Sequence, residues 1–355
     1  MPLPEQRHCW TAGLGAWSLS FATSKGRADL VAQLKEASPV WVTGAGGFIG
    51  LHLSRFLAGE GHHVLGFGRS EASGFAAATG GGAFFSGGVT AQTMDAALAV
   101  HGRPAAVYHL AGGATVGQSI ADPLKDFEQS VVSAACVLDF LRRHAPDASV
   151  VLASSAAVYG GGHFGPISVD AALEPYSPYG HHKRMVEELG RSYCAAYGQP
   201  VSVARLFSVY GEGLRKQLLW DLCGRLAAGE TDIVLGGTGT EMRDWHHVSD
   251  VVRLIHRILP AGEPRFAIYN GGAGAAAPVS TISSMVLEAW GGNHRLSFSG
   301  KSRRGDPVNL ISDPTGVPDG LQLRVPLSRG IAGYVDWYRA EILAEPVGHL
   351  RRSAP

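Results

Sequence analysis

A tyrosine and a lysine four residues apart carry the clearest chemical signal in the sequence. Tyr179 and Lys183 lie in a stretch with a helical pattern, so their side chains should share one face of a helix. Tyrosine ionises at about pH 10, and a neighbouring ammonium group lowers the phenol pKa by favouring the phenolate. The pair therefore predicts an acid/base that removes a proton from a hydroxyl group while hydride leaves the same carbon.

A serine at the end of a predicted buried strand adds a hydrogen-bonding group to this pair. Ser155 follows the apolar run 150–153, and ligands bind at the carboxyl ends of the strands in a parallel sheet. The serine hydroxyl could hold the reacting oxygen in place. We predict that Ser155, Tyr179 and Lys183 are the catalytic residues.

A glycine-rich turn supplies the second signal. Three glycines with GxxGxxG spacing join the predicted strand 40–42 to a helix expected from about 48 to 58. Glycines there allow a tight turn and let the backbone approach a pyrophosphate, whose charge the helix N-terminus favours. The sequence thus predicts NAD(P) binding. The expected cofactor contacts are Gly44, Gly47, Phe48, Ile49, Gly50, Arg69, Leu110, Ala111, Tyr179 and Lys183.

The choice between the two cofactors depends on the end of the second strand. An acidic residue there would hydrogen-bond the adenosine ribose of NAD, but the sequence has Gly68 followed by Arg69. Loss of the carboxylate removes repulsion of a 2′-phosphate, and a guanidinium can bind that phosphate through two hydrogen bonds. The cofactor is therefore NADP or NAD, and these two residues favour NADP.

Strands alternate with helices from about residue 40 to 206. This rhythm predicts an α/β fold with a Rossmann-type doubly wound parallel sheet. Shorter segments after about residue 208 predict a smaller C-terminal substrate-binding domain. The expected organisation is an N-terminal extension (1–38), a NAD(P)-binding Rossmann domain (39–207, with a returning segment at about 241–268), a mainly substrate-binding domain (208–345) and a tail (346–355).

Bulk composition narrows the class of protein. Lys+Arg and Asp+Glu both number 30, so no strong overall charge would attract nucleic acid or an anionic membrane. The four cysteines include no CxxC pair, which fits reduced thiols in a cytoplasmic protein. The apolar stretch 11–23 is too short to span a bilayer. Three His-His pairs lack accompanying acids or cysteines, so we predict no metal site.

The motifs, in this order, make the sequence similar to the extended short-chain dehydrogenase/reductases, in particular the nucleotide-sugar epimerase/dehydratase family. The similarity runs from about residue 40 to 338 and includes the segments 107–112, 205–211 and 243–250. Within the family, the sequence looks most like the branch of UDP-galactose 4-epimerase and related 4-ketosugar enzymes. The resemblance implies the same catalytic roles for the serine, tyrosine and lysine.

The resemblance also implies a nucleotide-diphosphate sugar as the partner. It assigns Arg243 and Arg303 to the substrate diphosphate and Asp306 to the nucleotide ribose. Gln217 falls near a polar substrate-binding position, and Ser208 stands in the substrate segment where asparagine is usual. Two arginines from separate segments could clamp a diphosphate that a near-neutral surface would not attract.

Family members often pair through the helices that correspond to residues 124–144 and 179–197, so the resemblance implies a homodimer. Two departures from the family pattern bear on chemistry. A lysine that contacts the cofactor in the galactose epimerase is replaced near Ala114. Ala156 and Ala157 stand where the 4,6-dehydratases carry an acid pair, which argues against elimination of water.

Three functional hypotheses remain open from the sequence. The leading one is an NAD(P)-dependent epimerase that oxidises and re-reduces the sugar at C4. The second is an NADPH-dependent reductase of a nucleotide 4-keto-6-deoxysugar, which Gly68 and Arg69 favour. The third, from another class, is a non-catalytic dinucleotide-sensing protein, and the intact catalytic triad argues against it.

Overall fold

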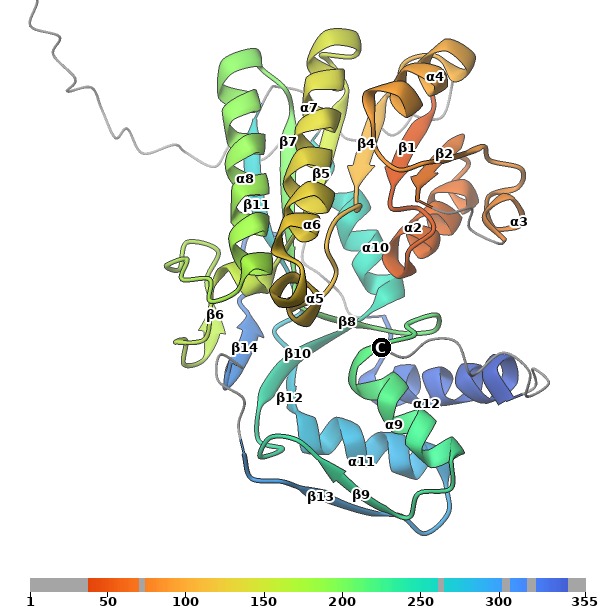
Figure 1. Cartoon of the computed structure of the whole chain (residues 1–355), viewed down its shortest axis with the longest axis vertical. Coiled ribbons are helices and arrows are strands. Elements are labelled where there is room, and N and C mark those ends of the chain that lie inside the picture. The colour runs from red at the N-terminus through yellow and green to blue at the C-terminus, as the bar shows by residue number, and fades with distance from the viewer. Residues whose placement is uncertain (1–37, 70–73, 261–264, 302–306, 318–323, 344–355) are drawn as a thin grey trace, which may run out of the picture.

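The computed structural model describes residues 38–69, 74–260, 265–301, 307–317 and 324–343. The predicted substrate residues Arg303 and Asp306 lie outside the described residues, as do residues 1–37 of the N-terminal extension and the tail. Figure 1 shows a large sheet flanked by helices, with a smaller group of strands and helices at its lower end. No helix within the described ranges is long and apolar enough to cross a membrane.

Seven parallel strands form the larger sheet. Their order is β3-β2-β1-β4-β5-β7-β11, so the strand order reverses between β1 and β4. In such sheets ligands bind at this reversal, beyond the carboxyl ends of the strands. The sheet confirms the predicted Rossmann-type α/β fold. Its strands are β1 (Val40–Thr43), β2 (Val64–Gly68), β3 (Phe84–Ser86), β4 (Ala106–His109), β5 (Ser149–Ser155), β7 (Val201–Leu206) and β11 (Phe266–Gly271).

Both faces of this sheet are covered by helices, and successive side chains of a strand enter opposite cores. Val40 and Val42 of β1 pack in a core with α2 and α10, whereas Trp41 packs in a second core with α4, α7 and α8. Burial on both faces explains why these strands read as apolar runs in the sequence. The covering helices are α2 (Phe48–Gly59), α4 (Ala91–His101), α7 (Ser133–His144), α8 (Pro178–Tyr197) and α10 (Val248–Arg257).

The smaller part contains shorter strands and three further α-helices among the described residues. Strand β10 pairs with β8, β12 and β14, and β14 pairs with β6, while β9 pairs with β13. The strands are β6 (Pro166–Ile167), β8 (Ser208–Tyr210), β9 (Asp232–Leu235), β10 (Met242–His247), β12 (Ala276–Pro278), β13 (Arg295–Phe298) and β14 (Asn309–Ser312). The helices are α9 (Gln217–Ala227), α11 (Val279–Trp290) and α12 (Leu327–Tyr338), followed by the π-helical segment η3 (Arg339–Leu343).

Several short helices connect the strands of the large sheet. Segments α5, α6 and η1 precede α7 and pack against α8. A single 3-10 turn, η2, follows β5. These segments are α3 (Phe75–Thr79), α5 (Val116–Ala121), α6 (Pro123–Phe127), the π-helical η1 (Glu128–Val132) and η2 (Ala156–Val158).

A buried ion pair fastens α8 to the sheet. Glu187 on α8 accepts hydrogen bonds from Nε (2.9 Å) and Nη2 (2.7 Å) of Arg205 on β7, and another from the Ser154 hydroxyl on β5. Arg205 also donates to the phenol oxygen of Tyr159, and the Tyr159 hydroxyl donates to Asn270 on β11. All five side chains are buried. The network therefore joins α8 to three neighbouring strands.

We predict that Glu187→Ala lowers the free energy of unfolding by about 3–5 kcal/mol, because it leaves the Arg205 guanidinium buried without its counter-charge. Denaturant unfolding followed by circular dichroism measures this change. The matched control is Asp139→Ala, which breaks ion pairs with Arg142 and Arg143 on the exposed side of α7. That control should shift the unfolding midpoint far less, and equal losses in the two variants would contradict the prediction.

Candidate active site

The glycine turn after β1 is pressed between α2 and the end of β4. Gly44 has φ +68°, and a Cβ there would lie 2.8 Å from the Ala111 nitrogen and 2.9 Å from the Leu110 carbonyl carbon. At Gly50, a Cβ would lie 2.1 Å from the Gly44 oxygen. The Ala111 amide also donates to Thr43 Oγ1 (3.2 Å), which holds the two loops together. Only glycine fits at either position.

The start of α2 suits a phosphate group. Gly47 is the N-cap residue and gives no side-chain hydrogen bond to the first-turn amides, which include those of Phe48 and Ile49. Unpaired amides and the helix dipole favour an anion at that place. The residues present thus fit the pyrophosphate of a dinucleotide. Most of the predicted cofactor contacts lie on this loop, on the first turn of α2 or at the end of β4.

Gly68, at the end of β2, lies against an aromatic ring of the neighbouring strand. A Cβ at Gly68 would lie 2.8 Å from the Phe84 ring of β3. A larger residue at this position would require the Phe84 ring to shift, whichever cofactor binds. Arg69 is exposed at the strand end, and its side chain approaches the loop at Gly88. The NADP preference stays a prediction, which rests on Gly68 and Arg69.

The three predicted catalytic residues come together at the ends of β5 and α8. Ser155 is the last residue of β5, and its Oγ accepts a hydrogen bond from the Ala157 amide (3.2 Å). Lys183 is buried and its Nζ donates to the Ala153 carbonyl (3.1 Å). The same Nζ lies 5.7 Å from the centroid of the Tyr179 ring. Strand end, phenol and ammonium therefore form one cluster.

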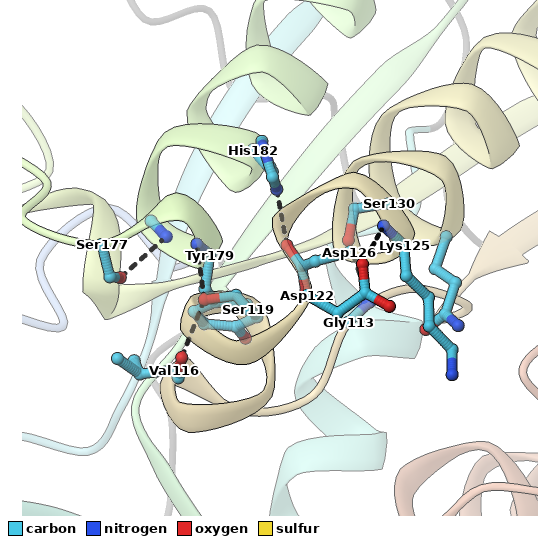
Figure 2. Close-up of polar contacts among 12 residues, drawn as sticks. Gly113, Val116, Ser119, Asp122, Lys125, Asp126, Ser130, Ser177, Tyr179 and His182 are labelled. Carbon is cyan, nitrogen blue, oxygen red and sulfur yellow. Dashed lines mark hydrogen bonds and ion pairs between the residues drawn. The ribbon is translucent and has the colours of Figure 1, made fainter.

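Local capping fixes the start of α8, which carries the tyrosine. Ser177 caps the helix by accepting a hydrogen bond from the Gly180 amide, and Pro178 occupies the first turn. The Tyr179 amide donates to Ser119 Oγ (3.0 Å) of α5, and the Ser119 hydroxyl donates to the Val116 carbonyl, as Figure 2 shows. This first turn is thereby anchored to α5.

Burial sets the protonation of the cluster. Burial raises the pKa of Tyr179. A hydrogen bond with Ser155 lowers that pKa, whereas the charge of Asp126 raises it further. Burial lowers the pKa of Lys183 to about 8, against the opposing effect of Asp126 and Glu187. The phenol therefore holds its proton at neutral pH until further positive charge is brought beside it.

The predicted substrate residues lie on the smaller part of the structure. Ser208 begins β8, which pairs with β10, and Arg243 lies on β10. The Arg243 guanidinium donates to the Pro307 carbonyl (2.8 Å), directly after the undescribed segment that contains Arg303 and Asp306. Gln217 is exposed at the start of α9 with φ +67°, the one non-glycine residue with positive φ among the described residues.

Sequence reasoning missed four side chains around this cluster. Ser119 and the buried pair Asp126–His182 stand beside Tyr179, although no motif marks them. Lys216 reaches across from the segment before α9, and its Nζ lies 3.4 Å from the Ala114 carbonyl. A cation thus approaches the loop where the family's lysine is absent, but it comes from another part of the chain.

A match over most of the chain decides the family. The NAD dependent epimerase/dehydratase family matches residues 40–272. The chain belongs to this family. Its members that resemble the chain are nucleotide-sugar epimerases and dehydratases, so the protein is an enzyme of the extended short-chain dehydrogenase class. No group of three or more metal-ligating side chains occurs among the described residues of this family member.

Two curated relatives and one solved structure illustrate the similarity. The chain is 31% identical to a UDP-glucose 4-epimerase of Azospirillum brasilense, over 80% of this chain and 87% of that protein. It is 28% identical to a probable UDP-glucuronate 4-epimerase of Rhizobium meliloti, over 84% and 96%. The structure of MoeE5 in complex with UDP-glucuronic acid and NAD superposes with a TM-score of 0.75 at 30% identity, covering 85% of this chain and 99% of that one.

We predict that Gly44→Ala weakens binding of the dinucleotide more than tenfold, because the added methyl group collides with the end of β4 and strains the left-handed backbone. Isothermal calorimetry with the cofactor-free protein measures the affinity. Gly59→Ala is the matched control, because a Cβ at the end of α2 meets no atom within 4 Å. Equal affinities of the two variants would contradict the assignment of this loop.

Proposed function

We propose that the protein is a nucleotide-sugar 4-epimerase that uses a bound nicotinamide dinucleotide to oxidise and re-reduce the sugar at C4. The observation that carries the proposal is the cluster of Ser155, Tyr179 and Lys183 at the ligand-binding end of the sheet. Names of the relatives support the substrate class, because they include UDP-glucose and UDP-glucuronate epimerases.

The residues of the cluster have distinct tasks in this reaction. The nicotinamide of the bound cofactor supplies the hydride acceptor and donor. Tyr179 takes the proton of the sugar hydroxyl and returns a proton to the carbonyl oxygen when that oxygen is reduced. Ser155 accepts from the Ala157 amide, so its own proton is available to the substrate oxygen or to the phenol oxygen. Lys183 places an ammonium group near the phenol and favours the phenolate once substrate binds.

Absence of an acid pair after the catalytic serine favours epimerisation over dehydration. Elimination of water needs an additional acid and base near the sugar. Ala156 is buried in η2 and Ala157 uses its amide to bond Ser155, so neither position can supply a proton. We therefore assign the reaction to oxidation and reduction at one carbon.

We further propose that the cofactor is NAD and stays bound through the catalytic cycle. MoeE5 was solved with NAD, and the closeness of the Phe84 ring offers a packing reason for the glycine at position 68. Identification of the nucleotide released from denatured protein tests this step. Bound NAD supports the epimerase, whereas a cofactor-free protein that turns over added NADPH with a 4-ketosugar would establish the reductase instead.

The substrate would lie between the two parts of the chain, with residues 208–345 supplying most of its contacts. In this proposal Arg243 and Arg303 hold the diphosphate, Asp306 holds the ribose, and Ser208 and Gln217 also contact the substrate. Arg243 is bonded to the carbonyl that follows the segment 302–306, which supports a shared site for the two arginines.

We predict that Tyr179→Phe lowers kcat for interconversion of a UDP-sugar and its C4 epimer on the order of 10²–10⁴-fold, because it removes the acid/base and keeps the ring. UDP-glucose and UDP-glucuronic acid are the first substrates to test, with the product sugars separated by chromatography. Tyr197→Phe on the exposed end of α8 is the matched control and should keep full activity. Unchanged turnover by Tyr179→Phe would overturn the mechanism.

We propose that two copies of the chain pair through α5, α6 and α8. Large apolar side chains are exposed on these elements and on η1: Ile120, Leu124, Val132, Met185 and Tyr197 are 63%, 67%, 44%, 45% and 55% exposed. Contact with the same surface of a second copy would remove this area from water.

Leu124→Glu should therefore dissociate the dimer, because it places a charge in the apolar interface. Sedimentation velocity at several protein concentrations measures the mass. Val100→Glu, at an apolar residue that is 73% exposed on α4, is the matched control and should leave the mass unchanged. A monomeric wild-type protein would contradict the pairing.

A further inference from the structure

A buried acid lies beside the catalytic cluster and takes no part in the reaction proposed above. Asp126 is on α6 and is 5% exposed, and its Oδ2 is 2.6 Å from Nδ1 of His182, which is 9% exposed. His182 precedes Lys183 on α8, so the pair spans the boundary between α6 and the catalytic helix (Figure 2). An acid is rarely buried without a specific partner or task.

The carboxylate is held close to the loop that follows β4. A Cβ at Gly113 would lie 1.7 Å from Asp126 Oδ1, so only glycine can stand opposite the acid. The Gly113 amide donates to Ser130 Oγ (2.9 Å), which fixes this loop against η1. The Asp126 side chain therefore lies between His182 and the loop that contains Gly113, and these two contacts fix its orientation.

Asp126 and Lys183 face neighbouring residues of one loop, because a Cβ at Gly112 would lie 3.1 Å from Lys183 Nζ and a Cβ at Gly113 would meet Asp126 Oδ1. From this place the charge of Asp126 acts on both members of the couple. It adds to the effect of burial in raising the pKa of Tyr179, and it opposes the effect of burial on the pKa of Lys183. A carboxylate near an ammonium group stabilises the protonated amine and disfavours a phenolate.

The other ionisable groups beside the couple cannot substitute for Asp126. Glu187 on α8 is paired with the Arg205 guanidinium through two hydrogen bonds, and its effect on the pKa of Lys183 ranks after that of Asp126. His109 lies on β4. Its pKa is lowered to about 3, mainly by burial and to a smaller extent by the charge of Lys183, so its ring is uncharged at neutral pH. Asp126 is hydrogen-bonded to the His182 imidazole and not to a guanidinium group.

We propose that Asp126 is a positioning residue that sets the charge balance of the Tyr179–Lys183 couple, and that His182 holds its carboxylate in place. The proposal rests on the proposed Tyr179 chemistry. The acid keeps the buried lysine protonated at neutral pH and keeps the tyrosine protonated until substrate and cofactor bind. The couple then releases its first proton at a higher pH than it would without the acid.

The test compares Asp126→Asn with wild-type protein in two measurements. Removal of the negative charge lowers the first macroscopic pKa of the couple, whichever of the two groups loses the proton. The acid limb of the kcat–pH profile should therefore move down by about one pH unit. The tyrosinate absorbance that is lost in Tyr179→Phe should titrate at lower pH by a similar amount, and this second readout requires no turnover.

Matched variants separate charge from packing. Glu128→Gln removes the same charge from an exposed residue two positions along the chain, and it should leave both titrations unmoved. His182→Gln keeps the Asp126 carboxylate and an N–H donor. It should reduce kcat only a few-fold and leave the acid limb of the kcat–pH profile at the wild-type pH. If Asp126→Asn does not fold, Asp126→Ser also removes the charge and should give the same shifts.

Two outcomes distinguish failure of this inference from failure of the proposed function. Asp126→Asn that loses activity equally at every pH, with the tyrosinate titration unchanged, would show that the acid only packs against the loop. Wild-type protein that turns over neither UDP-sugar, yet shows the tyrosinate shift in Asp126→Asn, would refute the reaction and leave the role of Asp126 standing.

Discussion

The buried Glu187–Arg205 ion pair sets the position of α8, the helix that carries the proposed catalytic residues. Tyr179, Lys183 and Glu187 succeed one another at four-residue intervals, so they line one face of α8. Arg205 and Ser154 bind Glu187 and so fix the rotation of α8 and its position along its axis. The positions of Tyr179 and Lys183 are fixed with it. Two buried charges are costly, and their mutual hydrogen bonds offset that cost while making the geometry specific.

The same burial that orders the site works against its chemistry. A phenol and an ammonium removed from water both favour their neutral forms, which is the wrong protonation state for a tyrosinate–lysine couple. Nearby acids oppose this tendency for Lys183, and the hydrogen bond with Ser155 opposes it for Tyr179. Opposing electrostatic effects therefore act on both side chains of the candidate active site.

Close backbone contact organises the cofactor side in a different way. There the loops after β1 and β4 touch through Gly44 and Ala111, and no side chain separates them. Such contact leaves the first turn of α2 open to an anion, because the N-cap residue has no side chain to satisfy its amides. The family to which the chain belongs is named for NAD-dependent enzymes, in agreement with this arrangement.

The sequence by itself determined the fold class and singled out the candidate catalytic and glycine-loop residues. Both depend on short-range patterns: apolar strand runs, glycine spacing and a four-residue helical repeat. It could not determine contacts between segments far apart in the chain. Asp126 meets His182 across 56 residues, Lys216 reaches Ala114 across 102, and the Phe84 ring lies against Gly68. No local pattern encodes such contacts, since packing of α6 on α8 and of β2 on β3 creates them, and tertiary structure alone decided the charge that surrounds the tyrosine.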